Sequence, residues 1–197
     1  MTETSGTTAA FYADQAATYA ADTGVYPASP NLQRFADRLP AGGCVLELGC
    51  GSGRESAWMI SQGLDVHPTD GIAEMAAEAA ARLGIPVSVL PFDAIEAVAV
   101  YDGVWANACL LHVPRTDLPD ILGRIRRAMK PGGLFYASYK AGHGEGVDRF
   151  GRYFNYPDEA FLRTTYGVGW TDVAIEAADG SGYDGVPTPW LHVFAEA

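Results

Sequence analysis

Hydrophobic residues follow two different spacings along this chain of 197 residues. Short apolar runs predict five strands, at 44–48, 64–69, 87–90, 101–106 and 134–139. Between these runs, apolar residues recur every three or four positions and predict helices, at 54–62, 72–83 and 118–129. Strands that alternate with helices need crossover connections. The pattern therefore predicts an α/β fold with a doubly wound, mostly parallel sheet.

The segments on either side of this alternation add further elements. Residues 11–21 and 31–39 have the spacing of two N-terminal helices. Residues 157–165 predict one more helix, and 170–177 and 189–195 predict two closing strands. We therefore expect a seven-stranded, mostly parallel sheet with helices on both of its faces.

Length, charge and cysteine content narrow the class of protein. A chain of 197 residues suits one domain, 1–197. The net charge of −11, with 13 basic against 24 acidic residues, disfavours nucleic acid and anionic membranes as partners. The sequence shows no membrane-spanning apolar run and no secretory signal, so we expect a cytoplasmic protein. Three cysteines without a CxxC pair predict neither a disulfide framework nor a metal site.

A glycine-rich stretch, "ELGCGSGR" at 47–54, separates the first predicted strand from a predicted helix. Glycines there allow positive φ and bring a ligand close to the free N–H groups of the helix. A phosphate-binding P-loop would need Gly-Lys-Ser/Thr, but the chain has Gly53-Arg54-Glu55. A dinucleotide fingerprint would need a small residue where Arg54 stands, which weakens that alternative without removing it.

The stretch "ELGCGSG" resembles the first motif of the class I, Rossmann-like S-adenosylmethionine-dependent methyltransferases. Three later segments fit the same family in order and spacing: "HPTDGIAEM", Phe92-Asp93, and 101–138 with its K-P-G-G turn. The resemblance covers about 44–139 and implies a cofactor-binding core there. Within it, "GCGSGRES" is also similar to small methyltransferases of the tellurite-resistance type.

The resemblance implies S-adenosylmethionine as the cofactor and gives candidate positions for binding it. An acid at Asp70 would hold the two ribose hydroxyls, although a helix N-cap is an alternative role for it. The helices of 1–40 would form a lid whose Tyr12 and Tyr19 cover the cofactor, or these tyrosines would simply pack the helix. The full set of implied cofactor residues is Tyr12, Tyr19, Gly49, Gly51, Gly53, Arg54, Asp70, Gly71, Ile72, Phe92, Asp93 and Asn107.

Methyl transfer is an in-line displacement that depends on alignment more than on acid–base groups. His112, which follows the fourth predicted strand, is the candidate catalytic base for an acceptor that must lose a proton. The alternative role is a packing or hydrogen-bonding histidine.

The segment 140–197 is expected to contain the acceptor loop and the closing strands. Residues 140–156 concentrate basic and aromatic groups in an otherwise acidic chain. Arginine binds carboxylates through two parallel hydrogen bonds, so this loop predicts a small, anionic acceptor. The candidate acceptor-binding residues are Lys140, Arg149, Arg152 and Tyr153. In the alternative, the arginines pair with Glu145, Asp148 or Asp158 instead.

The sequence thus predicts an S-adenosylmethionine-dependent methyltransferase that acts on a small, anionic molecule. Two alternatives remain: a non-catalytic module that binds the same cofactor, and a nicotinamide-dependent oxidoreductase. The identity of the acceptor and the oligomeric state are not indicated by the sequence.

Overall fold

The computed structural model of the protein describes residues 3–197 and contains one large sheet. Its seven strands follow the order β3-β2-β1-β4-β5-β9-β8. The strands from β3 to β5 run parallel, whereas β9 is antiparallel to both of its neighbours. This confirms the predicted doubly wound, mostly parallel sheet. The strands are β1 (Cys44–Leu48), β2 (Asp65–Asp70), β3 (Ser88–Val89), β4 (Tyr101–Ala106), β5 (Met129–Lys140), β8 (Thr171–Ser181) and β9 (Pro187–Glu196).

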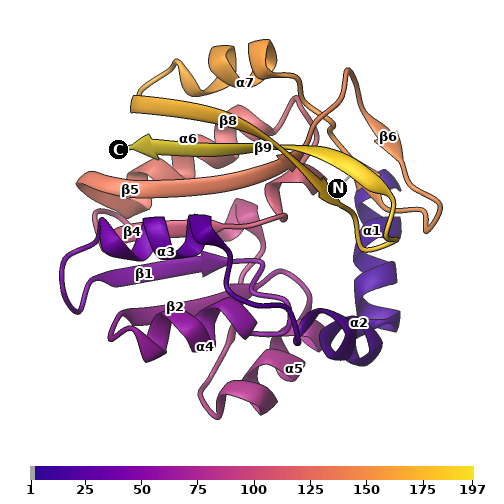
Figure 1. Cartoon of the computed structure of the whole chain (residues 1–197), viewed down its shortest axis with the longest axis horizontal. Coiled ribbons are helices and arrows are strands. Elements are labelled where there is room, and N and C mark those ends of the chain that lie inside the picture. Colours follow the sequence, from indigo (N-terminus) through magenta and orange to yellow (C-terminus); the bar gives the residue numbers. More distant parts are fainter. Residues whose placement is uncertain (1–2) are drawn as a thin grey trace.

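Helices cover both faces of the sheet (Figure 1). One face packs against buried side chains of α3 (Pro30–Asp37) and α4 (Arg54–Ser61). The other packs against α6 (Leu118–Ala128) and α7 (Glu159–Tyr166). Helix α5 (Ala73–Leu83) lies beside α4 and β2, and it ends at Gly84, whose positive φ of 69° stops a helix in the usual way.

Two helices at the N-terminus differ from the single helix predicted over 11–21. Helix α1 (Glu3–Asp14) and helix α2 (Ala16–Thr23) meet at Gln15, whose side chain makes no capping bond. In Figure 1 both helices lie at one end of the sheet, beside the turn between β8 and β9. The first turns of α1 carry small and polar residues without an apolar stripe, so hydrophobic spacing gave no signal for them.

The predicted acceptor loop is partly ordered as a hairpin. Strands β6 (Gly146–Val147) and β7 (Tyr153–Phe154) pair antiparallel in a small second sheet. Two short 3-10 helices, η1 (Phe92–Ala94) and η2 (Leu110–His112), follow β3 and β4. These irregular segments surround the carboxyl ends of the parallel strands, which is where open α/β sheets bind ligands.

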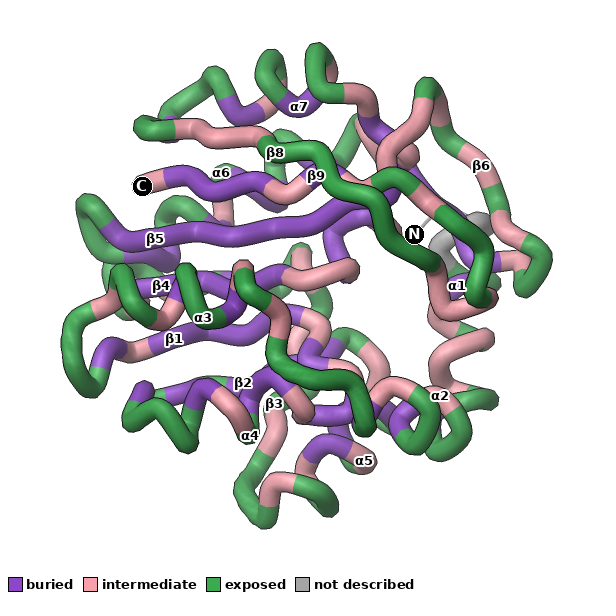
Figure 2. Tube along the Cα trace, viewed as in Figure 1, coloured by how far each residue is buried: buried purple, intermediate pink, exposed green. Residues whose placement is uncertain are grey.

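Burial is greatest in the centre of the sheet and low at its two edges, β3 and β8 (Figure 2). Strand β1 and the second half of β5 are buried almost throughout, whereas most of β8 is exposed. Trp105 on β4 and Tyr136 on β5 stack with ring centroids 3.9 Å apart. Among residues 3–197, no helix has the length and apolar character needed to cross a membrane.

Candidate active site

A cavity of about 810 Å³ opens at the carboxyl ends of the parallel strands. Small-molecule sites commonly occupy about 300–1,000 Å³, so this volume suits a cofactor with an acceptor. The cavity wall includes most of the residues predicted to bind the cofactor, and His112: Tyr12, Tyr19, Gly49, Gly51, Arg54, Asp70, Gly71, Ile72, Phe92, Asp93, Asn107 and His112. The remaining predicted residues lie outside the wall: Gly53, Lys140, Arg149, Arg152 and Tyr153.

The three glycines after β1 have positive φ and different surroundings. A Cβ at Gly49 would lie 2.5 Å from the Cβ of Cys109, so this glycine lets two strand ends approach each other. At Gly53 a Cβ would lie 3.0 Å from Leu83, which explains why this glycine packs against α5 rather than lining the cavity. A Cβ at Gly51 would meet only Met75 Cε, at 4.0 Å, so its backbone is the accessible part of the loop.

Asp70, at the end of β2, fixes the glycine loop from the side. Its carboxylate accepts N–H hydrogen bonds from Gly51 at 3.0 Å and from Ile72 at 2.9 Å. Burial raises the pKa of Asp70, and these backbone bonds oppose the shift. A carboxylate has about four lone-pair positions, so acceptor capacity remains for hydroxyl groups in the cavity. The residue thus keeps hydrogen-bond acceptor capacity toward the cavity, in addition to its local structural role.

Glu55, in the first turn of α4, is a cavity residue that the sequence gave no reason to select. It is buried and accepts hydrogen bonds from Trp105 Nε1 at 2.6 Å and from Asn107 Nδ2 at 3.0 Å. The Asn107 Oδ1 atom in turn accepts from Ser138 Oγ at 2.6 Å. Both ends of the Asn107 amide are therefore committed, and its backbone is the part left for a ligand.

Arg54 joins the α2–α3 connection to α4. Its guanidinium donates to the carbonyl oxygens of Tyr26 and Pro27, at 3.3 and 2.8 Å, and to Glu55 at 2.7 Å. Arg54 therefore lies in the wall of the cavity, and its guanidinium is fixed by these hydrogen bonds.

His112 is held between two groups that fix its tautomer. Its Nδ1 lies 2.6 Å from the carbonyl oxygen of Tyr153, which can only accept, so Nδ1 carries the proton. Its Nε2 then accepts from the Tyr12 hydroxyl at 3.0 Å. Burial lowers the pKa of His112 to about 4, and the positive charges of Arg152 and Lys140 add to this shift. A neutral ring with both nitrogens engaged is not poised to take a proton from an acceptor.

Arg152 is buried in the protein rather than exposed to the cavity. Its Nε and Nη2 donate to Asp148 Oδ2 at 2.9 and 2.7 Å, and its Nη1 donates to the Tyr12 hydroxyl at 3.2 Å. The rings around the guanidinium, with centroids 4.8 to 5.7 Å from Cζ, belong to Phe11, Tyr12, Phe150, Phe154 and Tyr183. This arrangement matches the alternative in which the arginine pairs with Asp148.

The other predicted acceptor residues also lie behind or beside the wall. Arg149 is exposed and donates to the carbonyl oxygen of Asp184 at 3.3 Å. Tyr153 is buried, and its hydroxyl donates to Glu145. Lys140 is buried with its Nζ 4.3 Å from the centroid of the Phe154 ring.

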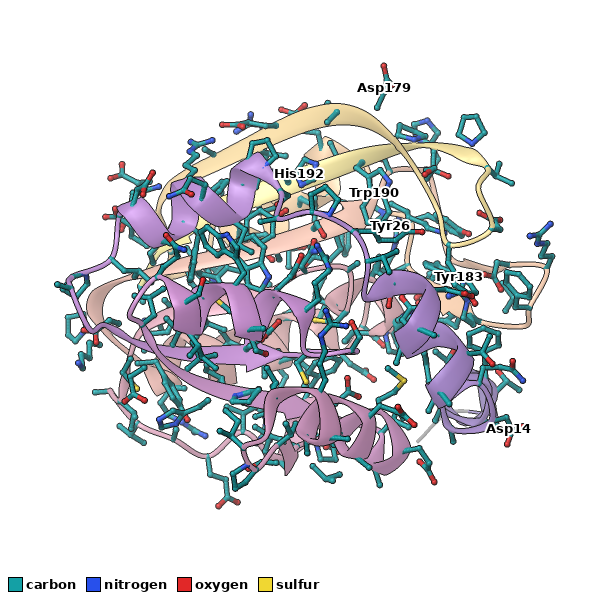
Figure 3. The ribbon with its side chains drawn as sticks, turned by 60° about the horizontal axis from the view of Figure 1, so that its bottom comes forward. Asp14, Tyr26, Asp179, Tyr183, Trp190 and His192 are labelled. Carbon is teal, nitrogen blue, oxygen red and sulfur yellow. The ribbon has the colours of Figure 1, made fainter. Side chains whose placement is uncertain are left out.

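The far wall of the cavity comes from the β8–β9 hairpin, which sequence reasoning did not connect with the site. Gly182, Tyr183, Trp190 and His192 all line it. Figure 3 shows His192, Trp190, Tyr26 and Tyr183 following one another across the molecule, whereas Asp179 points away from them. The hairpin reaches the N-terminal helices through the Tyr183 hydroxyl, which donates to Asp22 on α2 at 2.7 Å.

A family model described as a methyltransferase domain matches residues 19–166. The chain belongs to the methyltransferase domain family. Its cofactor is S-adenosylmethionine. The match covers the glycine loop, Asp70 and His112, and it ends at the last residue of α7.

Two characterised relatives have similar sequences over part of their length. The chain is 30% identical over 131 residues to a dimethylglycine N-methyltransferase of Parasynechococcus marenigrum (strain WH8102), which covers 62% of this chain and 45% of that protein. It is 29% identical over 126 residues to the S-adenosyl-L-methionine-dependent Diels-Alderase iccD of Talaromyces variabilis, covering 56% and 42%. The chain thus matches less than half the length of each relative.

Solved structures of methyltransferases share the fold. The 1,6-didemethyltoxoflavin-N1-methyltransferase of Burkholderia thailandensis superposes with a TM-score of 0.71 at 22% identity, over 95% of this chain and 88% of that one. TehB from Haemophilus influenzae gives 0.68 at 16% identity, over 90% and 65%. These similarities confirm the class I methyltransferase fold.

Proposed function

We propose that this protein transfers a methyl group from S-adenosylmethionine to a small molecule. The observation that carries the proposal is the pairing of the open glycine loop at Gly51 with the Asp70 carboxylate in one cavity. When bound, the cofactor supplies an electrophilic methyl group on a sulfonium, whose sulfur keeps the electron pair of the broken bond. The small-molecule acceptors in the names of the dimethylglycine and didemethyltoxoflavin enzymes support the same class.

Each part of the cofactor has a matching group in this chain. Asp70 would accept from the ribose hydroxyls, and Phe92 and Asp93 would lie against the adenine. Gly51 would bring backbone close to the methionine part, and the backbone of Asn107 would lie beside it. Tyr12 and Tyr19 would cover the bound cofactor from the N-terminal helices. The two tyrosine rings stand edge-to-face with centroids 5.2 Å apart.

The acceptor atom needs to arrive with its lone pair free. His112 has a lowered pKa of about 4 and both ring nitrogens in hydrogen bonds, so it gives little help as a base. Carboxylates, thiolates and unprotonated amines meet this requirement without a base. We assign His112 a positioning role, because it joins η2 to Tyr12 of the lid.

An anionic group on the acceptor would have Lys140 as its partner. A Cβ at the wall residue Gly182 would lie 2.7 Å from Lys140 Nζ, so the ammonium lies directly behind the wall. Burial lowers the pKa of Lys140, and the positive charge of Arg152 lowers it further. The carboxylates of Asp184 and Asp148 oppose this shift and partly balance the ammonium. An anion in the cavity would add a direct partner for it.

The test is methyl transfer from labelled S-adenosylmethionine to a panel of carboxylates, thiols, amines and metalloid oxyanions. We expect turnover of at least one class, and failure of every class with intact cofactor binding would reject methyl transfer. For the anionic acceptor, Lys140→Met should raise KM about 10–100-fold, the value of a charge-assisted hydrogen bond, and leave cofactor affinity unchanged. Arg149→Met is the matched control and should change neither. An unchanged KM in Lys140→Met would remove the anionic assignment.

A second candidate is a catalyst or binding module that holds S-adenosylmethionine without consuming it. This candidate is supported by the relative that is named as an S-adenosyl-L-methionine-dependent Diels-Alderase rather than as a methyltransferase. This alternative predicts tight cofactor binding with no demethylated product on any acceptor. The nicotinamide-dependent alternative is set aside because the chain belongs to the methyltransferase family.

A further inference from the structure

A cluster of three potential metal ligands lies at the opposite end of the sheet from the cavity. Cys44 is the first residue of β1, and Asp65 is the first residue of β2, with His67 two positions further on. The cofactor loop follows the other ends of these two strands, after Leu48 and Asp70. The cluster is therefore separate from the candidate active site.

Strand register brings the three side chains together. In the parallel pairing of β1 with β2, Cys44 lies opposite Asp65, and Leu46 lies opposite His67. Because successive strand residues point to opposite faces, Asp65 and His67 project on the same side of β2. Cys44 projects to that side from the neighbouring strand, so two strands supply ligands to one point.

The observed distances are close to those of a transition-metal site. Cys44 Sγ lies 3.8 Å from His67 Nε2, and His67 Nε2 lies 3.7 Å from Asp65 Oδ2. All three potential ligand atoms lie within 4.8 Å of one another. Tetrahedral zinc with bonds of about 2.3 Å to sulfur and about 2.0–2.1 Å to nitrogen and oxygen places such atoms about 3.3–3.6 Å apart. The two separations from His67 need to contract by a few tenths of an ångström. The separation between Cys44 and Asp65, which is within 4.8 Å, needs to contract by at most about 1.3 Å.

Neighbouring contacts keep this part of the structure in place. The Cys44 N–H donates to Asp102 Oδ2 at 2.9 Å, which holds the start of β1 against β4. The His67 ring stands edge-on to Tyr101 with centroids 5.5 Å apart. Lys130 pairs with Asp102 at 2.8 Å, which holds the start of β5 to the same acid.

The ligand types select the ion. A thiolate, an imidazole and one carboxylate suit zinc, whereas calcium and magnesium prefer oxygen alone. The His67 and Asp65 side chains are 47% and 67% exposed, so water can reach the fourth position. From this geometry we propose that Cys44, Asp65 and His67 bind a divalent transition metal of the zinc type, with water as the fourth ligand.

Cobalt(II) titration of the untagged, reduced protein tests the proposal directly. We expect the intense visible bands of tetrahedral cobalt together with a thiolate-to-cobalt charge-transfer band. Zinc added afterwards should displace the cobalt and abolish both. A weak octahedral spectrum without the charge-transfer band would overturn the proposal.

Single substitutions identify the ligands. Cys44→Ser should abolish the charge-transfer band, and His67→Gln and Asp65→Asn should each weaken metal affinity at least about tenfold. The matched control is His143→Gln, because His143 also lies 3.7 Å from an aspartate, Asp158, but is not part of the cysteine cluster. Equal binding by wild type and Cys44→Ser, or an effect of His143→Gln as large as that of His67→Gln, would show adventitious surface binding only.

A stability measurement supplies a second readout that does not depend on colour. Zinc in excess over its Kd should raise the Tm of the wild type and not that of His67→Gln, because a ligand that binds only the folded state stabilises it. Cofactor affinity, measured by calorimetry, should be the same with and without zinc and will report that each variant is folded. Equal zinc-induced Tm shifts in both proteins would overturn the proposal.

Discussion

Charged side chains differ between two sides of the cavity: the cofactor side, with the glycine loop and Asp70, and the lid side, with the N-terminal helices and Arg152. On the cofactor side, Asp70 is held by two backbone N–H groups and keeps lone pairs directed to the cavity. On the lid side, Arg152 and Asp148 neutralise each other, with side chains only 2% and 7% exposed. The comparison shows that a local concentration of charge in a sequence identifies a ligand site only when no internal partner satisfies it.

The largest effect is expected from breaking the buried pair on the lid side. Arg152→Ala leaves the Asp148 carboxylate buried without a counter-charge, and we expect a loss of about 3–5 kcal/mol in the free energy of unfolding. Denaturant titration measures this change. Exposed Arg149→Ala, the control three residues away, should stay within about 0.5 kcal/mol.

A double substitution separates pairing from packing at the same place. Arg152→Met combined with Asp148→Asn removes both charges and retains much of the side-chain volume. It should therefore be less destabilising than Arg152→Ala alone. If the double variant is the less stable of the two, the assigned role of Arg152 as the partner of Asp148 is incorrect.

The next largest effect is expected at Asp70, the buried acid on the cofactor side. Asp70→Ala removes the acceptor proposed for the ribose and releases the Gly51 N–H, so we expect affinity for S-adenosylmethionine to fall about 10–100-fold, equivalent to about 1.4–2.8 kcal/mol. Calorimetry in metal-free buffer measures it. Asp65→Asn, at the other end of the same strand, should leave the affinity unchanged, and equal losses in both would point to a general defect in β2.

The arrangement of the glycine loop, Asp70 and Phe92 at one edge of the sheet could be predicted from the sequence, because it depends on strand order rather than on side-chain contacts. The glycine loop, Asp70 and Phe92 each follow a strand, and parallel strands place their carboxyl ends at one edge. Strand β4 begins and ends where its apolar run predicts, at 101 and 106. Each of these residues could be placed from the sequence because it directly follows a strand that the apolar pattern predicts.

The lid side could not be predicted in the same way because its partners lie far apart in the chain. Tyr12 donates to His112, 100 residues away, and Arg152 contacts Tyr12 across 140 residues. Glu55 was overlooked for a similar reason, since its role depends on Trp105 and Asn107 from β4 and the turn after it. Only the folded chain shows which of several nearby acids satisfies each arginine.

A smaller effect is expected when His112 is titrated. Burial lowers its pKa to about 4 from an ordinary value of 6.5, so the unfolded chain binds the extra proton between these values. The stability that neutral His112 supports is complete above about pH 6.5 and is lost as the pH falls from there through about 4.

The measurement is the free energy of unfolding of wild type and His112→Asn across this pH range. The difference in stability between the two should shrink as the pH falls. The exposed His143→Asn control should follow the wild type. Parallel curves for wild type and His112→Asn would contradict the buried, neutral state of His112.

The smallest effects distinguish two hydroxyl groups that both connect the N-terminal helices to the rest of the protein. Tyr12→Phe removes a hydroxyl that bonds to His112 and Arg152, and we expect a loss of about 1–2 kcal/mol. Tyr183→Phe removes an exposed bond to Asp22 and keeps the ring in place, so we expect less than about 1 kcal/mol. Thermal unfolding and the rate of cofactor dissociation measure both variants. A Tyr183→Phe effect equal to that of Tyr12→Phe would mean that the exposed hairpin holds the lid as firmly as the buried network does.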